Sequence, residues 1–283
     1  MSGSDTTIAA ASAGDTASLR RRERWLEFKK PIPTWELILL GLVVWVLFFG
    51  IWKLATATGW APPFLLPAPD AVAMTLYELF ADRGFLMDLL VSVYRIIVSF
   101  AAACLIAVPL GVLMGSFSRI EALFNPLVSA WRYLPAPSFI PLLLMWFGTD
   151  DTSKLALLFI GVVWFLMTLV MDHTKAVKTE FIQTALTLGA NRWQVLWTVI
   201  VPAVMPNVVI TMRQMLAAAW TYLVIAEIMA ATDGIGAMMM RAKRFIHADE
   251  IMAGIVMIGV LGLLFDYLFR VLERILFSYQ EET

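Results

Sequence analysis

The sequence lacks most of what a metalloprotein or a nucleic-acid-binding protein needs. It contains one cysteine, Cys104, in an apolar run, which excludes a disulfide framework and a cysteine metal cluster. The two histidines, His173 and His247, lie far apart in the chain, so we expect no metal site. Charged residues make up only 15% of the 283 residues, and the net charge of -1 leaves no basic domain for nucleic acid.

Catalytic signatures are missing as well. The sequence has no G-x-x-x-x-G-K-[ST] phosphate-binding loop, so we expect that the chain holds no cofactor and does not hydrolyse ATP alone. It has no H-E-x-x-H or G-x-S-x-G, and Asp150 and Asp151 are expected in an outer loop. We predict no catalytic residue. An intramembrane enzyme and an ion-coupled carrier are the alternatives, the latter disfavoured because no convincing internal repeat is visible.

What the sequence has is apolar residues, which make up 60% of the chain and give a mean hydropathy of +0.80. A helix needs roughly 20 apolar residues to cross the hydrocarbon core of a bilayer. Backbone polar groups must be satisfied within each spanning segment, which favours helices. The prediction is an all-α integral membrane protein with six transmembrane helices, at 35–54, 89–114, 123–147, 155–171, 198–230 and 250–272.

Lys and Arg in the loops predict the orientation, because they are more frequent in cytoplasmic loops. With both termini inside, the inner segments carry more of these residues than the outer segments. The outer cluster of Arg241, Lys243 and Arg244 runs against the rule. We expect it to form a positive mouth for anions or, slightly favoured, to pair with acidic residues of a partner protein.

The chain divides into a tail and a membrane domain. Residues 1–34 are expected in the cytoplasm: 1–18 have the composition of a disordered segment, and 19–30 interleave basic and apolar residues, as does a short helix on the membrane surface. Residues 35–283 are predicted to form the six-helix domain. Within it, Asp70 is expected to cap a short helix over 70–82.

Residues within the spans are candidates for a translocation path. Pro135, Pro137 and Pro141 interrupt the third span, and broken helices commonly line transport paths, although a kink that only improves packing is the other interpretation. Charges inside a membrane are costly and therefore need a role. Arg213 is expected to attract an anion or to pair with backbone carbonyls or with Glu227, itself a structural residue or a gate partner.

Two further groups complete the path candidates. Trp220, Thr221 and Tyr222 lie in the middle of the fifth span and offer aromatic surface with hydroxyls, either to a small solute or to lipid and neighbouring helices. Arg95 and Arg132 lie near span ends, where we expect their side chains to extend to the membrane surface.

The longest polar inner segment between spans covers residues 172–206, with a break expected at Gly189 between two helices. It contains Gln183-Thr184-Ala185, three residues, Gly189, nine residues, and then Val199-Ile200-Val201-Pro202. This pattern resembles the cytoplasmic motif of binding-protein-dependent ABC importer permeases: E-A-A, three residues, G, nine residues, I, any residue, L-P. The spacing fits, whereas the identities depart at four positions: Gln183, Thr184, Val199 and Val201.

Other motifs, in the same order, resemble the nitrate/sulfonate/taurine/bicarbonate permeases. They are Pro135 through WFG at 146–148, AE at 226–227, DGIG at 233–236 and GVLGLLFDYLFRVLER at 259–274, within a family-like core of about 88–275. The resemblance implies the ABC importer permease fold in the bacterial cytoplasmic (inner) membrane. The implied partners are a second copy of the permease, two ATP-binding subunits that hold ATP and Mg, and an extracytoplasmic solute-binding protein.

The resemblance also implies a function and a docking site. The function is import of a small anionic or zwitterionic solute, sulfonate-like or taurine-like, by alternating access, with nitrate or bicarbonate as alternatives. A coupling helix between the fourth and fifth spans would contact the ATPase through Gln183, Thr184, Ala185, Gly189, Ala190, Asn191, Arg192 and Pro202. Because Gln183 replaces an acidic residue, we expect the shape of the turn to matter more than charge.

Overall fold

The computed structural model describes residues 32–277, and within that range every regular element is a helix. The chain falls into two compact units that divide between Ala55 and Thr56. Of the predicted cytoplasmic tail, residues 1–31 lie outside the described residues, and with them the basic segment 19–30.

The first unit contributes one long helix, α2 (Thr34–Ala57), which coincides with the first predicted span. None of its residues is buried. Its side chains include an aromatic series in which the rings of Trp45 and Phe49 stack with centroids 5.9 Å apart. An apolar helix of 24 residues with no buried face is what a lipid environment requires.

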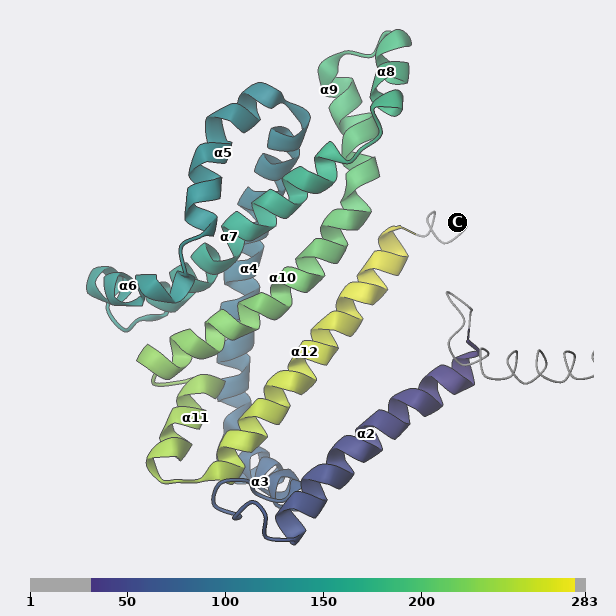
Figure 1. The fold of residues 1–283 in the computed structure, drawn as a ribbon. Coiled ribbons are helices and arrows are strands. Elements are labelled where there is room, and N and C mark those ends of the chain that lie inside the picture. Colours follow the sequence, from purple (N-terminus) through teal and green to yellow (C-terminus); the bar gives the residue numbers. More distant parts are fainter. Residues whose placement is uncertain (1–31, 278–283) are drawn as a thin grey trace, which may run out of the picture. The chain divides into compact units, whose positions relative to one another are not determined.

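The second unit contains the remaining helices (Figure 1). They are α3 (Pro69–Asp82), α4 (Phe85–Ser116), α5 (Ser118–Arg132), the 3₁₀ turn η1 (Ala136–Phe139), α6 (Ile140–Phe147), α7 (Asp151–Lys175), α8 (Thr179–Thr187), α9 (Arg192–Val195), the π-helical turn η2 (Leu196–Ile200), α10 (Val201–Ala230), α11 (Ile235–Arg244) and α12 (Ala248–Leu276).

Five helices of the described chain are long and apolar enough to cross a membrane: Thr34–Ala57, Phe85–Ser116, Asp151–Lys175, Arg192–Ala230 and Ala248–Leu276. They match five of the six predicted spans. The third, 123–147, is not one continuous helix, because α5 ends at Arg132 and the chain continues through η1 into the eight-residue α6. Prolines lack an amide hydrogen and disfavour helix in the preceding residue, so the predicted interruption at Pro135 and Pro137 is confirmed.

Helices α4, α7 and α10 form the core of the second unit, and α5 and α6 lie along α7 while α12 lies along α10 (Figure 1). Glycines let α4 approach α7 closely. A Cβ at Gly111 would lie 2.8 Å from the backbone oxygen of Met167 and 2.8 Å from Cβ of Val170. One turn further on, Gly115 faces Met171 and Thr174 in the same way. The two helix backbones therefore meet where α4 presents no side chain.

Gly111→Leu is expected to force α4 away from α7 and to lower stability by about 1–3 kcal/mol, the usual cost of overpacking a core. The measurement is the melting temperature of the purified protein in detergent. Gly259→Leu is the matched control, because a Cβ at Gly259 on α12 has nothing within 4 Å. Equal melting temperatures for the two variants would contradict the packing described for α4 and α7.

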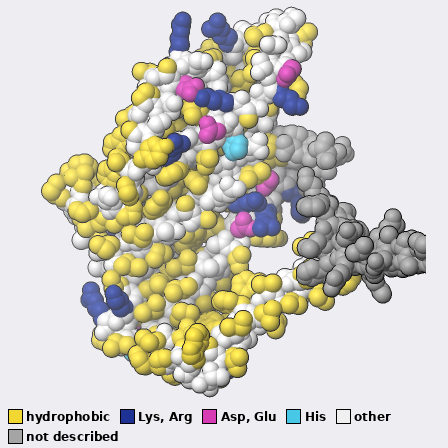
Figure 2. Space-filling model, viewed as in Figure 1, with side chains coloured by type: hydrophobic (Ala, Val, Ile, Leu, Met, Phe, Trp, Pro, Cys, Tyr) yellow, Lys and Arg dark blue, Asp and Glu magenta, His cyan; other side chains and the backbone are white. Residues whose placement is uncertain are grey.

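The two ends of the second unit are formed by different helices. Helices α8 and α9 project from one end, and α11 and α3 lie at the other (Figure 1). Apolar side chains cover much of the middle of the visible face, with several Lys and Arg side chains near the two ends (Figure 2). Asp70 does not cap α3 as predicted: Pro69 begins the helix, as proline readily does, and Ala68 precedes it.

Candidate functional site

The predicted coupling loop forms an exposed turn between α8 and α9. Gly189 has φ +87°, the left-handed region that suits glycine. The amide of Ala190 donates to the carbonyl of Ala185 at 3.0 Å, and the amide of Leu188 donates to that of Thr184 at 3.0 Å. These bonds satisfy carbonyls at the end of α8, as glycine-terminated helices usually do. The structure thus brings four of the predicted coupling residues into a single turn.

The start of the next helix is fixed by Asn191 and Gln194. Asn191 Oδ1 accepts from the amides of Trp193 and Gln194 at 3.0 and 2.9 Å, while the amide of Asn191 donates to Gln194 Oε1 at 2.8 Å. This is a reciprocal cap of the kind that commonly starts helices. Asn191 therefore holds the shape of the turn through its own hydrogen bonds.

The other predicted coupling residues are exposed or lie just beyond the turn. Gln183 and Arg192 are exposed, and Leu188 at the tip is 84% exposed. Pro202 lies in the first turn of α10, directly after the π-helical turn η2. Since proline has no amide hydrogen to donate to the carbonyl four residues earlier, the regular helical ladder is interrupted here.

An open groove of about 830 Å³ lies beside this turn, between α8–α9 and the junction of α4 with α5. Apolar side chains line much of it, and the rings of Phe117 and Trp193 lie 6.1 Å apart. Arg119 and Arg192 are among the lining residues. The groove can accept a protein surface that presents apolar groups together with negative charge.

A buried ionic network lies at the opposite end of the second unit, and we call it the Arg95 network: Asp88, Ser92, Arg95, Asp151, Glu227, Asp233 and the backbone of 234–236. Arg95 and Glu227 are 0% and 1% exposed. Arg95 Nη1 lies 2.8 Å from Glu227 Oε1, and Nη2 lies 2.5 Å from Asp151 Oδ1. Asp233 is a third carboxylate partner of Arg95.

Backbone and hydroxyl donors complete the Arg95 network. Glu227 accepts from the Ser92 hydroxyl at 2.7 Å and from the amide of Gly236 at 2.8 Å. The Ser92 oxygen accepts in turn from the amide of Ile235 at 2.9 Å. The AE and DGIG motifs are thus explained, because Glu227 closes the loop between α10 and α11 and binds it to α4.

One prediction about these charges is wrong, and one of the alternatives for Arg213 does not hold. Arg95 does not extend to the membrane surface, because three carboxylates hold it inside the protein. Glu227 pairs with Arg95 and not with Arg213, which lies 3.5 Å from Asp266 and 3.5 Å from Glu273 on α12. An arginine within a predicted span was the available signal for the network, but its partners are distant in sequence.

The cationic cluster on α11 is divided in the structure. Arg241 lies 2.7 Å from Asp88 Oδ2 and donates to the backbone oxygen of Thr232 at 2.7 Å, so it joins the Arg95 network. Lys243 and Arg244 are exposed. Arg241 is exposed as well, but Asp88 compensates its charge.

The broken third segment encloses a small cavity of about 240 Å³ against α7 and α10. We call it the aromatic chamber, and its principal lining residues are Trp131, Arg132, Tyr133, Pro135, Trp164 and Tyr222. Pro137 and Gly161 also line it. The structure thus brings together three of the predicted path residues: Pro135 and Pro137 from the broken third segment, and Tyr222 from α10.

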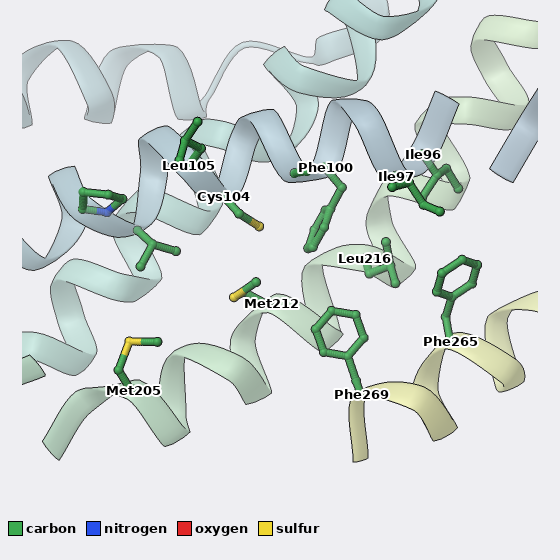
Figure 3. A pocket seen from close by; sticks show the side chains of 13 residues that line it. Ile96, Ile97, Phe100, Cys104, Leu105, Met205, Met212, Leu216, Phe265 and Phe269 are labelled. Carbon is green, nitrogen blue, oxygen red and sulfur yellow. The ribbon is translucent and has the colours of Figure 1, made fainter. Parts of the chain in front are cut away.

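The other path candidates lie elsewhere. Trp220 is buried and its ring lies 6.0 Å from Phe265 of α12, while Thr221 is exposed. A second cavity, of about 590 Å³, lies between α4, α10 and α12 and is lined entirely by apolar side chains, including Cys104, Met212 and Phe269 (Figure 3). It offers a polar solute no charge or side-chain hydrogen bond, so the aromatic chamber is the better candidate for solute contact.

The described chain has long apolar helices, an exposed capped turn at one end and the aromatic chamber at a broken helix. These features are typical of multi-span transport permeases. Residues 107–277 match the family described as binding-protein-dependent transport system inner membrane component. The chain belongs to this family. It is therefore a permease subunit of an ABC importer in the inner membrane, and its family implies separate ATP-binding and solute-binding partners.

Similar proteins agree with this assignment. The chain is 31% identical over 265 residues to the taurine transport system permease protein TauC of Escherichia coli (strain K12), covering 92% of this chain and 96% of TauC. It is 30% identical over 240 residues to the putative aliphatic sulfonates transport permease protein SsuC of Bacillus subtilis (strain 168), covering 85% and 87%. A subunit of the inward-facing MetNI methionine ABC transporter shares the fold, with a TM-score of 0.58, 18% identity and coverage of 65% and 91%.

Proposed function

We propose that two copies of this chain form the pore of an ABC importer, with two ATP-binding subunits docked at the turn between α8 and α9. The observation that carries this proposal is the exposed turn at Gly189, capped on both sides and placed beside an open groove. ATP and Mg belong to the docked subunits, and a solute-binding protein meets the α11 end. Movement of the docked turns switches the pore between two states by favouring one of them.

In this proposal the chain crosses the membrane six times, with both termini and the α8–α9 turn in the cytoplasm. The broken segment α5–η1–α6 serves as the third crossing. The ion pairs support this orientation. Among the outer cations, Arg83 pairs with Glu250, Lys154 with Asp151 and Arg241 with Asp88, so their charges are locally compensated.

The proposed solute is a small anion or zwitterion of the sulfonate or taurine type. The similarity to permeases named for taurine and aliphatic sulfonates supports it, as does the chamber lined by an arginine and aromatic side chains. Nitrate and bicarbonate are the alternative solutes for the same type of importer. The path runs along Pro135, Pro137 and Tyr222, with Glu227 fixing the outer end of α10.

Reconstitution in proteoliposomes tests this function. The chain is co-purified with its ATP-binding subunit, and taurine uptake and ATP hydrolysis are followed with and without the solute-binding protein. We expect hydrolysis only when the ATP-binding subunit is present, a rise with loaded binding protein, and uptake that requires all components. Uptake that proceeds without ATP, driven by an ion gradient, would contradict the proposal and would favour a secondary carrier.

A further inference from the structure

Arg132 differs from the other shielded arginines of the described chain. Arg95 and Arg213 each lie beside two or more carboxylates. Arg132 is partly buried, yet among residues 32–277 it has no carboxylate partner. Its guanidinium lies over the ring of Tyr133, 5.3 Å from the ring centroid. A positive charge at a broken membrane segment without a counter-ion is available for an anion.

Trp164, which lines the same chamber, carries an unused hydrogen-bond donor. Its Nε1 is buried and has no hydrogen-bond partner among the described residues. Buried donors are nearly always paired, so an unpaired indole N–H on a residue that lines the chamber can serve a ligand there once the ring turns toward it. Tyr222 contributes a second aromatic wall with a hydroxyl.

The walls of the chamber are held in place by close packing. The ring of Trp131 stacks on that of Phe139, with centroids 5.6 Å apart, and lies tilted against the ring of Trp164, at 5.4 Å. Tyr222 lies directly on Gly161, where a Cβ would come within 2.6 Å of Cδ2 of the ring. The shape of the aromatic chamber is therefore fixed by α5, η1, α7 and α10 together, which is the pre-organisation that a binding site needs.

The size and lining of the chamber select a class of ligand. Its volume of about 240 Å³ is smaller than the range typical of drug-sized ligands. Arg132 favours a negative group, Trp164 carries an unpaired N–H that a turn of its ring would present, and the aromatic walls suit a short apolar chain. We propose that the aromatic chamber is a solute subsite that holds the anionic head of a small organic sulfonate. This proposal rests on the importer function proposed above.

The test measures binding without the solute-binding protein. Saturation-transfer NMR with taurine as the probe is applied to the purified complex of permease and ATP-binding subunit. Trp164→Phe keeps the ring but removes the N–H, and Arg132→Gln removes the charge. Each is expected to weaken binding roughly tenfold, as the loss of one charge-assisted hydrogen bond would. Trp220→Phe is the matched control, because its Nε1 is also buried and unpaired but faces α12.

Competition and uptake separate the possible outcomes. Ethanesulfonate is expected to displace taurine, and ethanolamine is not; displacement by ethanolamine alone would overturn the proposal, because the aromatic walls would then be binding the ammonium group. If wild type, Trp164→Phe and Arg132→Gln bind taurine equally, the aromatic chamber is not a solute subsite. In that case, taurine uptake by the wild type with its binding protein still supports the importer function. If the wild type takes up no taurine with all components present, both the sulfonate subsite and the proposed import of sulfonates are overturned.

Discussion

Arg95→Met is expected to destabilise the protein so strongly that most of it no longer folds. Glu227 is 1% exposed, and the substitution leaves its carboxylate without the cation that lies 2.8 Å away. Breaking a buried ion pair by removing one partner typically costs about 3–5 kcal/mol, a large share of the marginal stability of most proteins. Size-exclusion chromatography and thermal unfolding in detergent measure the effect.

Two variants identify the cause of that loss. Arg213→Met removes an arginine whose pairs are longer, at 3.5 Å, and partly exposed, so we expect a much smaller change. Adding Glu227→Gln to Arg95→Met removes the unpaired charge and keeps one acceptor oxygen, for either the Ser92 hydroxyl or the Gly236 amide, and we expect it to recover part of the stability. If Arg95→Met melts at the same temperature as Arg213→Met, the Arg95 network does not hold this end together.

Gly189→Val is expected to lower uptake at least about tenfold while ATP hydrolysis by the complex continues. A non-glycine residue in the left-handed region costs roughly 1–2 kcal/mol, and a β-branched residue is especially unsuited to it. A change of 1.4 kcal/mol in docking corresponds to about tenfold in binding. The measurement is the number of taurine molecules imported per ATP hydrolysed in proteoliposomes.

Two matched substitutions test shape against charge at this turn. Gly189→Asn is expected to keep most of the uptake, because asparagine tolerates left-handed backbone. Gln183→Ala is expected to be mild, since its side chain is exposed and the turn is built from backbone bonds. A Cβ at Gly189 has nothing within 4 Å, so Gly189→Val adds backbone strain without a steric clash. Normal uptake by Gly189→Val would falsify the docking assignment.

Local patterns in the sequence were sufficient to predict the five long helices, the break in the third segment and the turn at Gly189. Five helices follow from runs of apolar residues, and the break in the third segment follows from Pro135 and Pro137, because the effect of proline acts on its own backbone. The turn at Gly189 was predictable for the same reason. The length of α6 was not, because α5, η1 and α6 divide an apolar run whose hydropathy alone suggests one helix.

Contacts between distant segments explain what the sequence left open. Arg95 meets Asp151, Glu227 and Asp233 only after α4, α7 and α10 have packed, so no local pattern reveals which carboxylate it binds. The aromatic chamber likewise combines three separate helices and one turn. Trp164 carried no distinguishing motif, and its importance lies in a donor that folding leaves unpaired.

Helix α10 connects the two ends of the second unit without interruption. It begins directly after the π-helical turn beside the docking turn, and three residues before its end Glu227 joins the Arg95 network. Thirty residues at 1.5 Å each make a rod of about 45 Å. In the importer proposed above, a slight tilt of this rod about its first turn, which contains Pro202, would move its far end, where Glu227 lies, by more than the end beside the docking turn.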